Sequence, residues 1–287
     1  MPTIVLKSHA KLNLYLRVSA RRPDGYHDIE TVFERISLCD TVGLSTVKGP
    51  AIRLRCNQPG VPLDESNLCV RAALALREAC GITAGCDIRL TKRIPMGAGM
   101  GGGSSNGAAV LTGLCRLWRV KLSPVKLMRI AAGLGSDVPF FMTGARFALA
   151  RGRGEKLRPL HGPALHHVIL MPPVHSSTRE IYAGWDTARA LTSPAADATI
   201  LLSALTKREP AAICAGLRND LERVAGKKYP AIIRARETLA GAPGCAGCLM
   251  TGSGAAVFGI FTSITAADTC ARRLRDGRVR VFRAETA

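Results

Sequence analysis

The stretch Ile94-Pro-Met-Gly-Ala-Gly-Met-Gly-Gly-Gly-Ser-Ser-Asn-Gly107 carries five glycines in the seven positions from Gly97 to Gly103, followed by two hydroxyl side chains. Glycine accepts positive φ angles and lets other groups approach closely, so that consecutive N–H groups can converge on an anion. Ser104 and Ser105 stand where helix N-cap residues are expected, because an apolar pattern with helical spacing follows them. A helix N-terminus offers unpaired N–H groups and a partial positive charge, so the stretch predicts a phosphate-binding loop.

Two common glycine motifs do not account for this loop. Gly97-Ala-Gly-Met-Gly-Gly102 satisfies the dinucleotide pattern G-x-G-x-x-G, but such a site needs an acidic residue about 20 positions further on, and the charged residues at 115–122 are all basic. The P-loop pattern fails because no Gly-Lys-Ser or Gly-Lys-Thr follows the glycines. A flexible linker is disfavoured, since the stretch joins an alternating strand pattern to a strong helix pattern.

The composition indicates a globular chain that binds anions. Its 287 residues suffice for two lobes, 47% are hydrophobic, and no apolar run approaches the length of a membrane span. The formal charge of +19 favours nucleic acid, a membrane surface or phosphorylated small molecules as partners. The basic residues are scattered and aromatics make up only 5%, so binding to nucleic acid is the second hypothesis.

The number and spacing of the cysteines indicate whether the protein works in an oxidising or a reducing compartment. The sequence contains ten of them, at irregular spacing. The first residues, Met1-Pro-Thr-Ile-Val-Leu-Lys7, show no secretory signal, so we expect reduced thiols and a cytoplasmic protein. Cys245-Ala-Gly-Cys248 is the one tight pair, and a zinc site would need a second pair of ligands. We therefore interpret the pair as a coincidence within a glycine-rich loop, and we predict no metal site formed by the protein alone.

Hydrophobic periodicity predicts alternating groups of strands and helices. Strands are expected at 3–18, 29–44, 52–56, 86–93, 146–151, 165–171, at the segment that ends at residue 261, and at 278–283. Helices are expected after a cap at Asp64 or Ser66, after the glycine loop, at 124–134 behind the Ser123 cap, within 180–240, and at 265–275.

Several polar residues in these elements have two interpretations. Lys11 and Asn13 fall on the same face of the first strand, where polar side chains are usually just solvated. Tyr26 and His27 directly follow a Pro-Asp-Gly turn. Asp137 stands in a turn, where by default it caps a short helix.

Three separated motifs, in their order and spacing, resemble the three signatures of the GHMP small-molecule kinases. They are His9-Ala-Lys-Leu-Asn-Leu14, Pro95-Met-Gly-Ala-Gly-Met-Gly-Gly-Gly-Ser-Ser-Asn106 and Met250-Thr-Gly-Ser-Gly-Ala255. Further strings resemble the branch of that superfamily that acts on a cytidine diphosphate-linked methylerythritol in the non-mevalonate isoprenoid pathway. They are Arg22-Pro-Asp-Gly-Tyr-His27, Leu134-Gly-Ser-Asp-Val-Pro139 and Asn219-Asp-Leu-Glu222.

The resemblance covers nearly the whole chain and implies a two-lobed α+β fold. The implied lobes are an N-terminal ATP-binding lobe at 1–155, similar to ribosomal S5 domain 2, and a C-terminal α/β sandwich at 156–287. The resemblance also implies a set of site residues. The catalytic pair would be Lys11 and Asp137, and the substrate would contact Asn13, Tyr26, His27 and Tyr182. Asn67, Lys92 and Met96 would lie near the nucleotide base of ATP. The other residues that would contact ATP are Gly97, Gly99, Gly101, Gly102, Gly103, Ser104 and Ser105.

The implied reaction is an ATP-dependent, Mg²⁺-assisted phosphorylation of the 2-hydroxyl of that alcohol, in which Asp137 acts as the base, Lys11 as its electrostatic partner, and Ser105 as a possible contact of Mg²⁺. Other kinases of the superfamily, of the homoserine or mevalonate type, are the first alternative, and the Tyr26-His27 turn argues against them. A basic nucleic-acid-binding module is the alternative from another class. We expect a small-molecule substrate, no obligatory nucleic acid, no membrane association, and a monomer or a weak homodimer.

Overall fold

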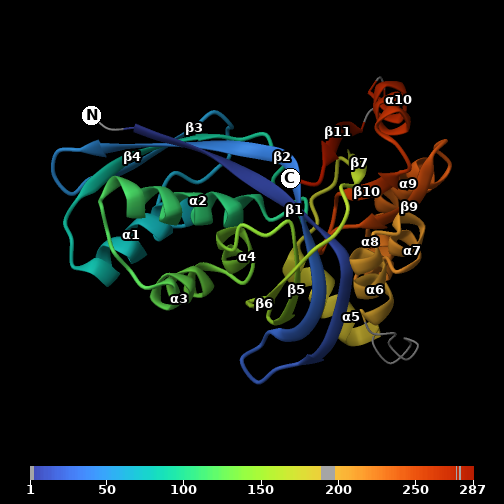
Figure 1. Ribbon diagram of the computed structural model, residues 1–287, viewed down its shortest axis with the longest axis horizontal. Helices are drawn as coiled ribbons and strands as arrows, with labels where there is room; N and C mark the ends of the chain where they lie inside the picture. Colours follow the sequence, from blue (N-terminus) through green and yellow to red (C-terminus); the bar gives the residue numbers. More distant parts are fainter. Residues whose placement is uncertain (1–2, 189–197, 276, 278) are drawn as a thin grey trace. The chain divides into compact units, whose positions relative to one another are not determined.

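A computed structural model describes residues 3–188, 198–275, 277 and 279–287 of the chain (Figure 1). The chain forms two compact units. The first comprises the chain up to Ala10, Cys39–Met96 and Gly101–Gly144, and the second comprises Lys11–Leu38, Gly97–Met100 and Ala145–Ala287. The units are defined by compactness rather than by chain order, and the division into lobes at 1–155 and 156–287 stays a prediction.

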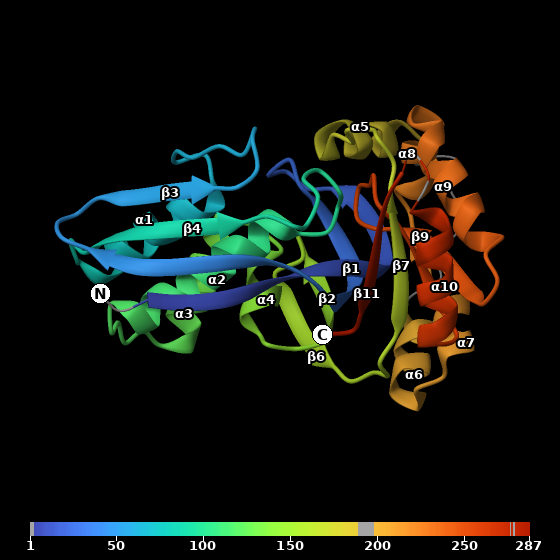
Figure 2. The ribbon, with the colours of Figure 1, turned by 90° about the horizontal axis from the view of Figure 1, so that it is seen from above.

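Two long strands, β1 (Thr3–Arg21) and β2 (His27–Val47), contribute residues to both units. In the first unit β2 pairs antiparallel with β4 (Gly85–Thr91), and β4 pairs parallel with β3 (Ile52–Cys56). Figure 2 shows these strands side by side. The alternation of apolar residues at 3–18, 29–44 and 52–56 therefore predicted real strands.

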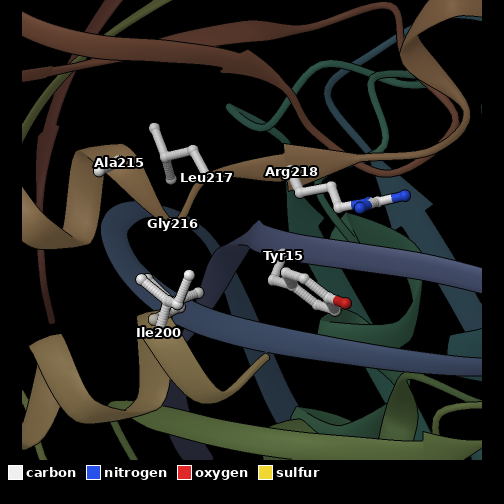
Figure 3. A pocket seen from close by; sticks show the side chains of 7 residues that line it. Tyr15, Ile200, Ala215, Gly216, Leu217 and Arg218 are labelled. Atoms are coloured by element: carbon white, nitrogen blue, oxygen red, sulfur yellow. The ribbon is translucent and has the colours of Figure 1, made fainter. Parts of the chain in front are cut away.

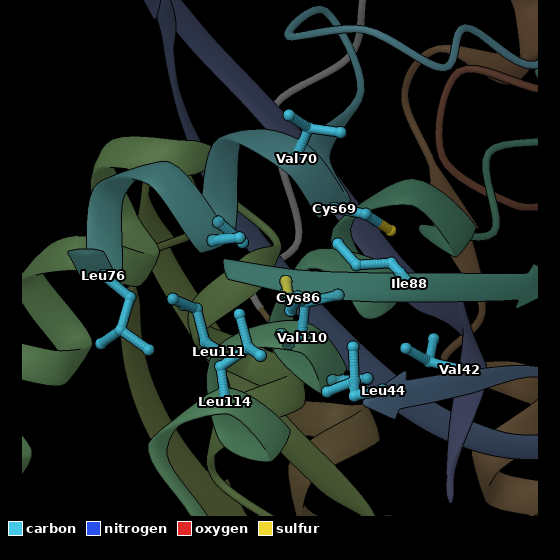
Figure 4. Close-up of a cluster of buried hydrophobic side chains, with 14 of the residues drawn as sticks. Val42, Leu44, Cys69, Val70, Leu76, Cys86, Ile88, Val110, Leu111 and Leu114 are labelled. Carbon is cyan, nitrogen blue, oxygen red and sulfur yellow. The ribbon is translucent and has the colours of Figure 1, made fainter. Parts of the chain in front are cut away.

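Helices α1 (Leu68–Cys80) and α2 (Gly102–Leu117) cover one face of these strands (Figure 1), and α3 (Pro124–Leu134) and α4 (Val138–Met142) follow. Figure 4 shows the core between α1, α2 and the sheet, which includes Leu44, Leu76, Ile88, Val110 and Leu111. Each fully buried side chain of this kind contributes about 1.5–3 kcal/mol relative to its exposed state. Burial of these apolar stripes fixes the start of α2, and with it the exit of the glycine loop.

The second unit contains the sheet β11-β7-β10-β9, in which neighbouring strands are antiparallel. These strands are β7 (His166–Met171), β9 (Cys245–Met250), β10 (Val257–Phe261) and β11 (Arg280–Glu285). The helices α9 (Pro230–Ala240) and α10 (Ile264–Leu274) pack against it (Figure 2). The preceding helices are α5 (Thr178–Ala188), α6 (Thr199–Lys207), α7 (Pro210–Ala215) and α8 (Glu222–Lys228).

Three further strands of the second unit extend the pairing of β1 and β2. β5 (Phe147–Gly152) pairs antiparallel with β2 and with β6 (Lys156–Leu160), and the short β8 (Arg218–Asn219) pairs parallel with β1. The mixture of helices with parallel and antiparallel strands confirms the α+β class. Within the described residues, no helix is both long enough and apolar enough to cross a membrane.

The helix caps correct two expectations. Gly101, and neither Ser104 nor Ser105, is the N-cap of α2, because the glycine loop reaches the helix with a left-handed residue that only glycine adopts readily. Asn67, rather than Asp64 or Ser66, caps α1 by accepting a hydrogen bond from the N–H of Cys69.

Two other cap predictions have different outcomes. Ser123 caps α3 as predicted, accepting a hydrogen bond from the N–H of Lys126. Asp137 occupies the N-cap position of α4 but makes no side-chain capping hydrogen bond.

Candidate active site

The glycine loop joins β4 to α2 and has an unusual backbone. Gly97, Gly99 and Gly101 have φ angles of 64°, 72° and 66°, in the left-handed region. Gly101 has no side chain to accept hydrogen bonds from the first turn of α2, whose leading N–H groups have no partner within the helix. N–H groups at the start of a 16-residue helix suit an anion, and phosphate binding by this loop stays a prediction.

The first part of this loop, Gly97–Met100, belongs to the second unit and lies against the third motif, residues 250–255. A Cβ atom on Gly99 would stand 2.2 Å from the carbonyl oxygen of Thr251. The N–H groups of Ala255 and Ala256 donate to the carbonyl oxygens of Gly97 and Ala98, at 3.3 and 3.4 Å. The loop therefore needs glycine at position 99 because another backbone occupies the place of a side chain.

The first motif meets the same two segments. The N–H of Lys11 donates to the carbonyl oxygen of Met100 at 3.0 Å, and the N–H of Asn13 donates to Oγ1 of Thr251 at 3.0 Å. Residues far apart in the sequence thus form one arrangement of strand β1, glycine loop and the turn after β9. The order and spacing of the three motifs implied this meeting only through the resemblance.

Lys11 and Asn13 are both buried, in contrast to the solvated face that β-strand alternation alone would suggest. Lys11 is 4% exposed; its ammonium donates to Oδ1 of Asn13 and lies 5.2 Å from the ring centre of Phe33. The Nδ2 group of Asn13 donates to Oγ1 of Thr31 at 2.8 Å. A buried ammonium held by polar partners is suited to interact with an anion at short range, because few water molecules screen it.

The remaining residues predicted to contact ATP lie in the first unit. A Cβ atom on Gly102 would stand 3.1 Å from Nζ of Lys92, and one on Gly103 would stand 3.8 Å from Cδ1 of Leu68. The start of α2 therefore lies beside Lys92 and beside the start of α1, where Asn67 is the cap. This end of α2 suits a polyphosphate. It offers backbone N–H groups and the ammonium of Lys92, and its glycines leave room for phosphate oxygens to approach.

The two hydroxyl side chains of α2 differ in exposure. Ser104 is half-buried, whereas Ser105 is 2% exposed and accepts a hydrogen bond from Oγ of Ser8 at 2.8 Å. Met96, predicted to lie near the nucleotide base, is 44% exposed. A Cβ atom on Gly135 would stand 4.0 Å from Oγ of Ser104, so the turn that carries Asp137 lies near this end of α2.

The predicted substrate residues Tyr26, His27 and Tyr182 lie in the second unit. The ring centres of His27 and Tyr182 are 5.1 Å apart with a tilt of 38° between the planes. Tyr26 is 54% exposed and has the guanidinium of Arg153 at 5.0 Å from its ring centre. The structure thus brings His27 and Tyr182 together, and Tyr26 presents an aromatic ring beside a cation.

Two acidic residues near the predicted site were missed by the sequence reasoning. Asp186, one helical turn after Tyr182 on α5, lies 2.6 Å from Nε2 of His27 through its Oδ1 atom. Asp40 on β2 is fully buried and pairs with Lys92 at 2.5 Å. Asp186 could have been found from the sequence, because it follows Tyr182 by four residues and residues at this spacing share one face of a helix. Asp40 has no local signal, because its partners come from other elements.

A separate pocket of about 300 Å³ lies in the second unit (Figure 3). Tyr15, Ile200, Leu217 and Arg218 are among the residues that line it, and it includes none of the predicted site residues. The described residues contain no cluster of three His, Cys, Asp or Glu side chains arranged to hold a metal ion. All ten cysteines lie in the described part of the chain and are free thiols.

Comparisons with known proteins identify the family of the chain. The model of the GHMP kinases N terminal domain matches residues 67–145, and the model of the GHMP kinases C terminal domain matches residues 201–278. A 4-diphosphocytidyl-2-C-methyl-D-erythritol kinase of Pelotomaculum thermopropionicum is 42% identical over 95% of this chain and 94% of its own length. One of Geobacter metallireducens is 42% identical over 92% of this chain and 91% of its own length.

Solved structures give the same result. A crystal structure of 4-(cytidine 5'-diphospho)-2C-methyl-D-erythritol kinase matches 99% of this chain and all of its own, with a TM-score of 0.83 and 35% identity. Homoserine kinase from Cytophaga hutchinsonii matches with a TM-score of 0.73 at 19% identity, which shows the shared fold alone. The protein therefore has the GHMP kinase fold and is an ATP-dependent small-molecule kinase, and the chain belongs to the 4-diphosphocytidyl-2-C-methyl-D-erythritol kinase family of the GHMP kinases.

Proposed function

We propose that the protein transfers the γ-phosphoryl group of ATP to the 2-hydroxyl of 4-diphosphocytidyl-2-C-methyl-D-erythritol, a step of the non-mevalonate route to isoprenoid precursors. The observation that carries the proposal is the 42% identity to a kinase of this name over 94% of that kinase's length. The glycine loop at the start of α2, with its left-handed backbone, supports the ATP part of the assignment independently.

The loop and the start of α2 are proposed to hold the phosphates of ATP. The N–H groups after Gly101 would donate to phosphate oxygens, and the Lys92 ammonium beside Gly102 would add positive charge. Mg²⁺, bound with ATP, would neutralise phosphate oxygens, and the hydroxyl of Ser105 is the proposed protein contact. Asn67 and Met96 would lie near the base.

Asp137 and Lys11 are proposed as the catalytic pair. Asp137, at the start of α4, would accept the proton of the attacking hydroxyl, which general base catalysis requires. The buried ammonium of Lys11 would stabilise charge on the phosphoryl group as it is transferred. These roles come from the resemblance, and the burial of Lys11 supports the second.

The second unit would bind both the cytidine and the alcohol end of the substrate. His27, Tyr182 and Tyr26 are proposed to contact cytosine, and the ring pair of His27 and Tyr182 supports this. Asn13 would contact the methylerythritol end. We also propose that the protein acts in the cytoplasm, where thiols such as its ten free cysteines stay reduced, as a monomer or weak homodimer.

An assay of ATP consumption tests the proposal. The purified protein is given Mg-ATP with the cytidine diphospho-alcohol, with mevalonate or with homoserine, and the phosphorylated product is identified by mass spectrometry. We expect turnover with the cytidine substrate alone, and loss of turnover when EDTA removes the metal. Turnover of mevalonate or homoserine in its place would refute the substrate assignment and keep the fold assignment.

A further inference from the structure

Asp40 is a buried carboxylate near the middle of β2 that receives four hydrogen bonds. Its Oδ1 atom accepts from the N–H groups of Arg93 and Ile94, at 2.7 and 2.8 Å. Its Oδ2 atom accepts from Nζ of Lys92 at 2.5 Å and from Nδ2 of Asn106 at 2.9 Å. All of these groups lie in the first unit, and Asp40 itself has no exposed surface.

These partners flank the glycine loop on both sides. Arg93 and Ile94 immediately precede it, and Asn106 lies in the second turn of α2, which follows it. One side chain from a different strand therefore binds the entry and the exit of the loop at once. Displacement of this carboxylate would remove hydrogen bonds at both ends of the loop and leave the bond from Nζ of Lys92 to Oδ1 of Asn106, at 3.1 Å, as the remaining link between them.

A chain of hydrogen bonds continues from Asp40 to Ser105. The Nδ2 group of Asn106 also donates to Oγ of Ser8 at 2.8 Å, and Oγ of Ser8 donates to Oγ of Ser105 at 2.8 Å. Because the Ser8 oxygen accepts the hydrogen bond from Nδ2 of Asn106, the hydroxyl hydrogen of Ser8 points to Ser105. The Ser105 oxygen is then an acceptor in this chain, which orients its hydroxyl group.

Asp40 also determines where the Lys92 ammonium lies. Nζ of Lys92 donates to Oδ1 of Asn106 at 3.1 Å as well as to Asp40, and it would stand 3.1 Å from a Cβ on Gly102, the first residue of α2. A cation at a helix N-terminus is unfavourable by itself, because that end of the helix dipole is positive. The position becomes favourable when an anion binds there.

Stability alone is a poor explanation for this cluster. A buried ion pair stabilises a fold little more than well-packed apolar side chains of the same volume, and often less. The arrangement is better explained by the geometry it imposes: it holds the loop ends, the ammonium and the Ser105 hydroxyl around one helix N-terminus.

We propose that Asp40 is a positioning residue for the phosphates of the nucleotide, acting through Lys92, Asn106 and the two backbone N–H groups that precede the loop. It does not itself contact the nucleotide. The inference rests on the proposed function in one respect, namely that the glycine loop binds the phosphates of ATP.

Asp40→Asn is the direct test. The amide keeps the size of the carboxylate and one acceptor oxygen, but it places an NH₂ group against the donors of Lys92 and Asn106. We expect the affinity for Mg-ADP, measured by calorimetry, and 1/KM for ATP to fall at least tenfold. The KM for the cytidine substrate is expected to stay within twofold, because its proposed contacts lie in the second unit.

Glu34→Gln is the matched control, since Glu34 is another fully buried carboxylate on β2. It accepts hydrogen bonds from Nε2 of His167 at 2.9 Å and from Oγ1 of Thr286 at 2.6 Å, in the second unit. We expect Glu34→Gln to lower Tm without changing the affinity for Mg-ADP. An equal loss of nucleotide affinity in this variant would show a general effect of destabilisation and overturn the inference.

A double variant separates positioning from folding. If Asp40→Asn folds poorly because it leaves the Lys92 ammonium unpaired, Asp40→Asn with Lys92→Met removes that charge and is expected to recover Tm. Nucleotide affinity is expected to remain below that of Lys92→Met alone, because Asp40 also holds the N–H groups of Arg93 and Ile94. Recovery of both Tm and affinity would reduce Asp40 to a structural role.

Nucleotide binding by the wild-type protein distinguishes failure of the proposed function from failure of the inference about Asp40. If it binds no Mg-ADP or Mg-ATP, the proposed function fails. If it binds them and a folded Asp40→Asn variant binds them equally well, only the inference about Asp40 fails.

Discussion

The Nε2 atom of His27 lies 2.6 Å from Oδ1 of Asp186, within the second unit. His27 begins β2 and Asp186 lies near the end of α5, so a strand and a helix together determine the direction of the imidazole ring. A carboxylate at this distance holds Nε2 as the protonated nitrogen and leaves Nδ1 for another partner. The tilted ring of Tyr182 packs against the same imidazole.

Asp186→Asn is expected to raise KM for the cytidine substrate about tenfold, because a hydrogen bond to a charged group is worth about 1.5–3 kcal/mol and the ring loses its fixed orientation. KM for ATP is expected to stay unchanged. Steady-state kinetics with each substrate varied in turn measure the difference. Glu180→Gln, on the same helix in an exposed pair with Lys228, is the control and is expected to change neither constant. A parallel rise of both KM values in Asp186→Asn would contradict the specific role of this carboxylate.

Tyr182→Ala and Tyr26→Ala test the aromatic contacts to cytosine. Stacking of a base on an aromatic ring contributes about 1–3 kcal/mol, so each substitution is expected to raise KM for the cytidine substrate roughly 5- to 150-fold. Tyr229→Ala, which removes a tyrosine beside Lys228, serves as the control. If the tyrosines are only packing groups, Tm will fall while KM for the cytidine substrate keeps its wild-type value.

Gly99→Ala should weaken nucleotide binding. A side chain there would meet the carbonyl oxygen of Thr251 at 2.2 Å, and the φ of 72° costs a non-glycine residue about 1–2 kcal/mol. We expect Mg-ADP affinity to fall at least tenfold in equilibrium titrations. Gly133→Ala, in α3 with open space around its Cβ position, is expected to be neutral or slightly stabilising. Normal affinity in a folded Gly99→Ala variant would show that the loop does not hold phosphate.

Asp137→Asn tests the proposed base. The amide keeps the shape of the side chain but cannot accept the proton, so kcat is expected to fall about 10²–10⁴-fold with little change in either KM. If Asp137 serves only as the N-cap residue of α4, Asp137→Asn is expected to leave both stability and turnover nearly unchanged, because Asn is as good a cap as Asp. Thermal unfolding measured beside kcat separates the two outcomes.

Lys11→Met should also lower kcat, because it removes a buried positive charge proposed to stabilise the transferred phosphoryl group. If Lys11 and Asp137 act as one unit, the double variant loses less than the product of the two single losses. Strictly multiplicative effects in the double-mutant cycle would contradict a shared step.

Cys248 is predicted to react with iodoacetamide before Cys245. A hydrogen bond from Cys245, aided by the charge of Arg236, lowers the pKa of the Cys248 thiol, whereas the same hydrogen bond and burial raise the pKa of Cys245. The thiolate is the nucleophile, so Cys248 is expected to react at a lower pH than Cys245. Peptide mass spectrometry across a pH series measures this order. Faster labelling of Cys245 than of Cys248 at neutral pH would contradict it.

The sequence by itself predicted the elements that depend on local patterns. Alternation located β1, β2 and β3, helical spacing located the helix after the glycine loop, and Ser123 was identified correctly as a cap. These features need only neighbouring residues, because period, capping and turn preference are properties of a short segment. The resemblance of three motifs supplied the family, since those strings are specific even without a structure.

Tertiary structure alone decided which of these residues meet. Asp40 reaches both ends of the glycine loop, Asn13 reaches Thr251, and His27 reaches Asp186, and each of these contacts joins elements that are distant in the chain. Strand pairing and helix packing place such partners together, and no short segment encodes them. The N-cap of α2 shows the same limit on a smaller scale. Gly101 rather than a serine occupies it, because the path of the whole loop requires a left-handed residue at that point.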